Sequence, residues 1–290
     1  MHPEASARNH RKQARWIAAS LIIVALPVAA CSGTSNSGSD GDASAQVTTT
    51  TAVALEQPGV RCGAPETKAT LIRFQAADGT SLNGVMVGRG TGGVVLAHAY
   101  PDDLCGSWPF ADYLAKRGLR AFAIDLRCFG RSACPEGDAR GRVVDDLDAA
   151  VAELRRRGVT RVGLVGASMG GAAVLIAGTR VQPPATAVVS LSGETDPTSL
   201  VGSIPLNAGA AVGQLTVPTM LVVATNDRYV SVEETRTMYQ AVRNRDKRLE
   251  VLSGPFDGQH GWQLLNDPAT GEFSSAAAKV AAFLTAHTRG

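Results

Sequence analysis

The sequence predicts an α/β protein built on a mostly parallel central sheet of about eight strands, with helices on both faces. From residue 94 onward, short apolar segments alternate with longer segments of helical pattern, which is typical of parallel strands joined by helices. The apolar segments are hydrophobic throughout rather than at every second residue, as expected for strands covered on both sides. With 290 residues, 44% of them hydrophobic, the chain can build one large core, and we expect a single domain over residues 61–290.

The predicted strands begin with a hairpin. Residues 71–74 and 82–87 are two strand-like segments separated by Asp78-Gly79-Thr80, a sequence typical of a tight turn. The later apolar segments are predicted to be parallel strands, at residues 94–98, 121–125, 162–166, 186–190, 219–224 and 248–252.

The predicted helices carry recognisable start and stop signals. Helices over 109–117 and 143–157 are each followed by a glycine, the residue favoured just after a helix. Ser231 followed by Glu234 forms a capping box that opens another helix. Residues 275–287 have the Ala/Leu/Val pattern of a final amphipathic helix.

The most informative motif follows the apolar segment 162–165. Residues 166–171 read Gly-Ala-Ser-Met-Gly-Gly, so a predicted strand ends in Gly-x-Ser-x-Gly and turns into a helix. Such a turn presents Ser168 to a cleft rather than to the core, because the glycines let the backbone pack closely around it. The N–H of Met169, at the start of the helix, can hold an anionic oxygen.

Two partners for this serine follow in the chain. Asp227 comes just after the apolar segment 218–224, and His260 lies in a glycine-rich loop after residues 249–252. A serine hydroxyl needs an imidazole to take its proton, and the imidazole needs a carboxylate to fix its tautomer and stabilise its charge. We therefore assign Ser168 as nucleophile, His260 as general base and acid, and Asp227 as the orienting acid.

Other residues of the same types compete less well for these roles. Asp196 is the alternative acid, with Glu194 behind it, because both follow the predicted strand 186–190. Asp257 and Asp267 lie too close in sequence to the histidine loop. Of the other histidines, His98 fits a packing role and His287 lies in the C-terminal tail.

The order serine, acid, histidine resembles that of the α/β-hydrolase superfamily, and the resemblance covers about residues 67–288. Residues 94–100 resemble the strand and loop that supply the second oxyanion donor, which by this resemblance is the N–H of Tyr100 beside that of Met169. Residues 125–132 resemble the Asp-x-Arg-Gly-x-Gly-x-Ser loop of the superfamily. The chain departs from these patterns at Ala99 and Cys128, which replace glycines.

The resemblance implies a serine hydrolase that cleaves carboxylic esters through an acyl-enzyme, similar to capless and dienelactone-hydrolase-like members. Only about 27 residues, 191–217, fill the place where many members insert a cap domain, so we expect a minimal cap and an open cleft. Such a cleft suits bulky, polymeric or varied substrates better than a small molecule that needs full enclosure, and the expected substrate is a small-molecule or polymeric ester. The alternatives are an amidase, peptidase or acyltransferase using the same acyl-enzyme, and an inactive surface binding protein. No cofactor is expected, and no Cys/His spacing indicates a metal site.

The first sixty residues differ in kind from the rest. Residues 1–30 have a basic start and an apolar stretch that ends in small residues before Cys31, which resembles the signal peptide of a bacterial lipoprotein. The alternatives are an ordinary signal peptide or an uncleaved anchor. Residues 31–60 begin with a Ser/Gly/Thr-rich stretch suited to a flexible tether. We expect an exported protein, facing the cell exterior or periplasm and held to the membrane through a lipid on Cys31.

Cysteine content and charge agree with export. Beyond Cys31 the chain has four cysteines, Cys62, Cys105, Cys128 and Cys134, an even number that predicts two disulfides near the predicted active site. Three pairings remain open, and the alternative is four unpaired cysteines. Without residues 1–30 the chain carries 24 basic and 25 acidic side chains, so nucleic acid is not expected as a partner. We expect a monomer.

Overall fold

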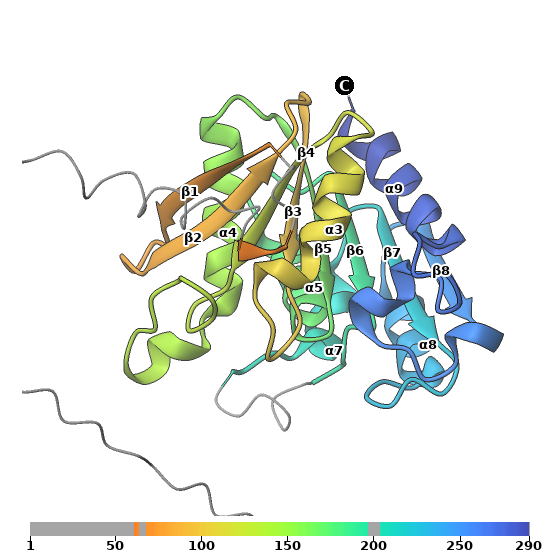
Figure 1. Cartoon of the computed structure of the whole chain (residues 1–290). Helices are drawn as coiled ribbons and strands as arrows, with labels where there is room; N and C mark the ends of the chain where they lie inside the picture. Colours follow the sequence, from red (N-terminus) through yellow and green to blue (C-terminus); the bar gives the residue numbers. More distant parts are fainter. Residues whose placement is uncertain (1–60, 64–67, 197–203, 290) are drawn as a thin grey trace, which may run out of the picture. The chain divides into compact units, whose positions relative to one another are not determined.

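A computed structural model describes residues 61–63, 68–196 and 204–289. They form an eight-stranded sheet in the order β1-β2-β4-β3-β5-β6-β7-β8 (Figure 1). β2 pairs antiparallel with β1 and with β4, whereas every pairing from β4 to β8 is parallel. The strands are β1 (Ala69–Gln75), β2 (Ser81–Val87), β3 (Gly92–Ala97), β4 (Arg120–Asp125), β5 (Arg161–Ala167), β6 (Ala187–Leu191), β7 (Thr219–Ala224) and β8 (Lys247–Leu252).

Helices cover both faces of this sheet and bury two separate layers of apolar side chains. The α-helices are α3 (Leu104–Ala115), α4 (Val143–Arg156), α5 (Met169–Arg180), α7 (Ala208–Ala211), α8 (Val232–Ala241) and α9 (Ser275–Thr288). One layer lies between the sheet and α3 and α9, and the other between the sheet and α4, α5 and α8. Short 3-10 segments η1 (Gly137–Gly141), η2 (Val212–Gln214), η3 (Gly254–Phe256) and η4 (Gly261–Leu265) lie in the connections. The predicted fold class is confirmed.

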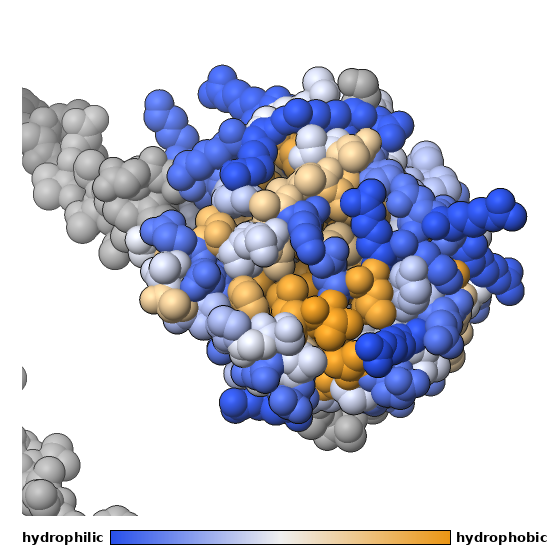
Figure 2. All heavy atoms as spheres, turned by 90° about the vertical axis from the view of Figure 1, so that its right-hand side faces the viewer, coloured by the Kyte–Doolittle hydropathy of each residue, from blue (hydrophilic) through white to orange (hydrophobic). Residues whose placement is uncertain are grey.

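The predicted strands are all present, with ends that differ by a few residues. β8 is the last strand of the sheet and pairs with one strand, β7, so its side chains are only partly buried. Its polar Arg248 and Glu250 therefore depart from the fully apolar pattern of the inner strands. Figure 2 views the molecule from the side of β8 and shows hydrophobic side chains in the middle of this face, with hydrophilic side chains around them.

Helix ends follow the capping signals, with one correction. α8 begins after Ser231 with the predicted capping box, in which the Ser231 and Glu234 side chains each accept a backbone N–H. The helix predicted from residue 109 begins instead at Leu104. The reason is that Asp103 accepts the N–H of Cys105 and caps the helix there, so Pro109 lies inside it.

The segment between β6 and β7 confirms the predicted minimal cap. Of this segment the structure describes residues 192–196 and 204–218, which contain only α7 and η2. No inserted domain is present in these described residues, so the carboxyl ends of β5, β7 and β8 meet at an edge with little cover.

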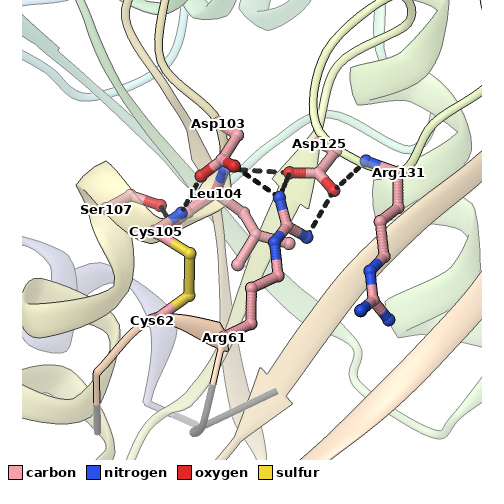
Figure 3. The surroundings of a disulfide bond; sticks show 8 residues. All are labelled: Arg61, Cys62, Asp103, Leu104, Cys105, Ser107, Asp125 and Arg131. Atoms are coloured by element: carbon pink, nitrogen blue, oxygen red, sulfur yellow. Dashed lines mark hydrogen bonds and ion pairs between the residues drawn. A yellow bond between two sulfur atoms is a disulfide. The ribbon is translucent and has the colours of Figure 1, made fainter. Parts of the chain in front are cut away.

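A disulfide and an ion-pair cluster fix the start of α3 at this edge (Figure 3). Cys62 is bonded to Cys105 in the first turn of α3. The neighbouring Arg61 contacts Asp103 at 2.5 Å and the buried Asp125 at 2.9 Å. Asp125 also accepts the N–H groups of Leu104 and Arg131, so its buried charge is paired and hydrogen-bonded.

The second disulfide closes a small loop after β4. Cys128 is bonded to Cys134, only six residues further on. Cys128 has a φ of 69°, a left-handed conformation that favours glycine, which explains why the superfamily pattern has glycine at this position. Both predicted disulfides are present, with the pairing that the sequence left open.

The predicted signal peptide, Cys31 and the tether lie outside the described residues. Within the part of the chain that the structure describes, no helix is both long enough and apolar enough to cross a membrane.

Candidate active site

Ser168 lies at a sharp turn between β5, which ends at Ala167, and α5, which begins at Met169. Its φ of 53° and ψ of −119° are strained for a non-glycine residue. The two glycines of the motif make the turn possible. A Cβ on Gly166 would lie 2.2 Å from the carbonyl oxygen of Gly170, and a Cβ on Gly170 would lie 2.5 Å from that of Ala97. The predicted strand–turn–helix context of Ser168 is confirmed.

The structure brings His260 and Asp227 into direct contact, although they are far apart in the chain. Nδ1 of His260 lies 2.9 Å from Oδ1 and 3.0 Å from Oδ2 of Asp227. The Asp227 side chain is fully buried, and Oδ1 also accepts the N–H of Tyr229. Burial alone would raise the pKa of Asp227, but hydrogen bonds from His260, Tyr229 and Ser192 outweigh it and lower the pKa. Asp227 is therefore a carboxylate suited to orient the imidazole.

The histidine loop packs directly against the turn that carries Ser168. The N–H of Gly261 donates to Oγ of Ser192 at 3.0 Å, and the N–H of Ser168 donates to the carbonyl of Leu191. A Cβ on Gly261 would lie 4.0 Å from the backbone nitrogen of Ser168. The loops after β5, β6, β7 and β8 thus meet at one edge of the sheet.

The hydroxyl of Ser168 does not donate to His260 in this structure. It donates to Oε1 of Glu194 at 3.2 Å, and Nε2 of His260 is buried without a hydrogen-bond partner among the described residues. Burial raises the pKa of Glu194 more than its contacts with Ser168 and His260 lower it. The sequence indicates Glu194 only as an alternative to Asp227 for the acid, behind Asp196, because nothing in its local pattern predicts a contact with Ser168.

The competing carboxylates and His287 lie in other surroundings. Asp257 accepts from the Thr225 hydroxyl, and Asp267 caps its own loop through the N–H groups of residues 269 and 270. Asp196 is exposed. His287 contacts the carbonyl of Phe283 and the carboxylate of Asp246.

His98 ties together the loops that border the predicted oxyanion site. It is fully buried, Nε2 accepts the N–H of Leu126, and Nδ1 lies 2.7 Å from the carbonyl oxygen of Ala99. Burial lowers the pKa of His98, so its imidazole is neutral and donates from Nδ1. Tyr100 follows in this loop, with 48% of its surface exposed, and its ring packs edge-on against Phe129. Met169, the other predicted donor, is the first residue of α5.

A cleft of about 270 Å³ opens beside His260. Its walls include three aromatic side chains, Tyr100, Tyr229 and Trp262, with Asp102 and Arg228 as charged neighbours. The ring of Tyr229 packs edge-on against the imidazole of His260. In residues 61–63, 68–196 and 204–289, no group of three or more His, Cys, Asp and Glu side chains could hold a metal ion.

Comparison with known proteins shows which families and solved structures this chain resembles. A family model described as serine aminopeptidase, S33, matches residues 88–205, which include the Ser168 turn. An esterase of Pyrococcus furiosus superimposes with a TM-score of 0.66 at 17% identity, over 80% of this chain and 95% of the esterase. The chain has the α/β-hydrolase fold.

Two further structures show how widely this fold is shared. A dienelactone hydrolase from Anabaena variabilis has a TM-score of 0.59 at 22% identity, over 77% of this chain and 99% of the hydrolase. A monoacylglycerol lipase of Paleococcus ferrophilus has a TM-score of 0.59 at 17% identity, over 71% and 99%. None of the curated proteins compared with the chain matches it. Identities this low establish the fold and leave the substrate to be argued from the site.

Proposed function

We propose that this α/β-hydrolase cleaves carboxylic esters through Ser168, His260 and Asp227. The observation that carries the proposal is the imidazole of His260, which Asp227 holds through Nδ1, while Nε2 is buried without a hydrogen-bond partner among the described residues in the loop that packs against the Ser168 turn. With Nδ1 protonated, Nε2 is an acceptor, which is the state that a general base requires. The proposal requires the Ser168 side chain to rotate away from Glu194, so that its hydroxyl can donate to that nitrogen.

The proposed reaction has two steps. Oγ of Ser168 attacks the ester carbonyl while its proton passes to Nε2 of His260, and this proton then goes to the leaving alcohol as the C–O bond breaks. Water attacks the acyl-enzyme in the same way and releases the acid. The N–H groups of Met169 and Tyr100 are proposed to hold the oxyanion, where removal of one donor costs about 3–4 kcal/mol of barrier.

A fluorophosphonate probe tests the nucleophile. We expect labelling of the folded protein at Ser168, none in Ser168→Ala, and strongly slowed labelling in His260→Ala. A series of esters of increasing acyl length then tests the reaction itself. A folded wild type that is not labelled would contradict the proposal and favour the alternative of an inactive surface binding protein.

Amide or peptide cleavage is the second candidate, because the matching family model is described as serine aminopeptidase. The same acyl-enzyme serves both reactions and acyl transfer. Parallel assays of p-nitrophenyl esters, aminoacyl amides and acyl acceptors separate the three activities.

We further propose that the enzyme is exported and anchored through a lipid on Cys31. The support is the signal-like segment 1–30 and the tether 31–60 in the sequence. Labelled palmitate should be incorporated into the wild type and not into Cys31→Ser. Incorporation into neither would overturn the anchor.

A further inference from the structure

The contact between Ser168 and Glu194 is an unusual feature for a nucleophile. Glu194 is buried, with 7% of its surface exposed, and its Oε1 accepts the Ser168 hydroxyl at 3.2 Å. The proposed mechanism gives this carboxyl no part, since Asp227 already orients the histidine.

The backbone after β6 holds Glu194 in this place. Ser192 has a φ of 48°, and Gly193 packs against the first turn of α5. A Cβ on Gly193 would lie 2.8 Å from the carbonyl carbon of Gly171 and 2.1 Å from Oγ of Ser190. This close packing fixes the turn, so Glu194 points at Ser168 because of the fold and not because of a flexible side chain alone.

No cation of the described chain neutralises Glu194. It forms no ion pair with an Arg or Lys of the described residues. The charged groups that face it from other elements are the carboxylates of Asp227 and Glu234, together with the imidazole of His260. Burial raises the pKa of Glu194, in agreement with the lack of a counter-ion.

Acyl transfer removes the one donor that Oε1 has among the described residues, the hydroxyl of Ser168. When Oγ of Ser168 bonds to the carbonyl carbon, its hydrogen passes to His260 and leaves with the alcohol, so the acyl-enzyme oxygen has no hydrogen to donate. A buried acceptor that loses its hydrogen bond is destabilised unless another donor replaces it. The acyl group itself is the nearest source of such a donor.

We propose that Glu194 binds a hydrogen-bond donor on the acyl group, and that this enzyme prefers acyl groups with a hydroxyl or ammonium on the carbon next to the reacting carbonyl. This inference depends on the proposed function. A donor at that position is three bonds from Oγ, through the carbonyl carbon and the carbon next to it. Oε1 lies 3.2 Å from Oγ while Ser168 faces Glu194, and rotation of Ser168 towards His260 would leave this space beside Oε1 to the donor of the acyl group. A neutral alkanoyl group leaves Oε1 without a donor.

The test compares ethyl esters of propionate, of each enantiomer of 2-hydroxypropionate, and of 2-aminopropionate. Acid release is followed by titration at constant pH. Each kcat/KM is divided by the rate constant for hydroxide hydrolysis of the same ester, which corrects for intrinsic reactivity. For the wild type we expect one 2-hydroxypropionate enantiomer to exceed propionate by about tenfold or more, which corresponds to about 1.4 kcal/mol.

Two substitutions separate the acceptor from the charge. Glu194→Gln keeps a carbonyl oxygen, so it should keep the preference for the hydroxyl and lose that for the ammonium. Glu194→Leu should lose both. Glu233→Gln, a change at an exposed position of α8, is the control and should leave the ratios unchanged. Equal corrected rates for propionate and both hydroxy esters in the wild type, or ratios that are the same in wild type and Glu194→Leu, would overturn the inference.

Fluorophosphonate labelling distinguishes this failure from failure of the proposed function. Labelled wild type without an acyl preference overturns only the role of Glu194. An unlabelled, folded wild type overturns the hydrolase reaction itself. If Glu194→Leu does not fold, Glu194→Gln still decides. Loss of the preference for the ammonium in this variant supports the role of Glu194, and an unchanged preference overturns it.

Discussion

The active-site edge of the sheet is built in two different ways. The loops after β3 and β4, here called the braced half, carry both disulfides and the ion pairs of Arg61 with Asp103 and Asp125. The loops after β6, β7 and β8, here called the catalytic half, hold Glu194, Asp227 and His260 by hydrogen bonds, and none of the four paired cysteines lies there. From this difference we expect the disulfides to contribute mainly to the stability of the fold, and the hydrogen bonds of the catalytic half to contribute mainly to the proposed reaction.

Within the catalytic half, two buried carboxylates have opposite properties. Hydrogen bonds from three groups lower the pKa of Asp227 against its burial, whereas Glu194 has fewer donors and its pKa is raised. Burial is common to both, so the number of donors decides whether the pKa of the carboxyl is raised or lowered.

Asp227→Asn tests the catalytic half and should have the largest effect. Asn cannot stabilise the imidazolium and favours the wrong tautomer of His260, so kcat should fall by about 10⁴-fold. The thermal midpoint should change far less than in the disulfide variants below. Steady-state hydrolysis and thermal unfolding of the same preparations measure both. Near wild-type activity would show that another acid orients His260.

Removal of the Cys62–Cys105 disulfide tests the braced half. The bond closes a loop of 43 residues, and replacement of both cysteines by serine should lower the free energy of unfolding by about 4 kcal/mol on loop entropy. Urea unfolding measures this change. Activity of the folded fraction should stay within a small factor of the wild type. A loss of activity as large as that expected for Asp227→Asn would show that the braced half is also needed for the reaction.

Removal of the Cys128–Cys134 disulfide should have a smaller effect. Its separation of six residues predicts a loss of only about 2 kcal/mol. The same urea experiment tests the ranking of the two bonds. A greater loss here than for Cys62–Cys105 would show that the left-handed backbone at Cys128, rather than chain entropy, dominates.

Glu194→Gln should have the smallest effect, and its sign depends on pH. Because folding raises the pKa of Glu194 above its ordinary 4.5, ionisation of this group destabilises the folded state. That cost is absent well below pH 4.5, grows as the pH rises towards the raised pKa, and is complete above it. Glu194→Gln should therefore be more stable than the wild type at high pH, with no such gain at low pH. Unfolding curves across this range test the sign.

Asp227 should give the opposite pH trend. Its lowered pKa stabilises the folded state above the ordinary 3.8, and this stabilisation is lost as the pH falls through the lowered value. Asp227→Asn should therefore lose stability relative to the wild type at neutral pH and match it at acidic pH. A stability difference that does not change with pH would contradict the pairing with His260.

Most of the fold and the identity of three site residues could be predicted from local patterns. The turn around Ser168 was predicted from the two glycines of the motif, because glycine is needed where two backbone segments approach closely. The structure shows this close approach at Gly166 and Gly170. Asp227 and His260 were predicted because each lies in the loop after an apolar segment. In the structure the two side chains are in contact with each other. The start of α3 was placed wrongly, since Pro109 was read as a beginning while Asp103 provides the cap.

The sequence by itself determined the strands, the helices and the proposal of Ser168, Asp227 and His260 as site residues, because periodicity, capping and glycine spacing act over a few neighbouring residues. Only the tertiary structure decided which cysteines form disulfides, which carboxylates pair with Arg61, and which side chain accepts the Ser168 hydroxyl. These contacts join residues far apart in the chain. Their distances depend on the strand order of the sheet and on close packing between loops, which no local pattern records.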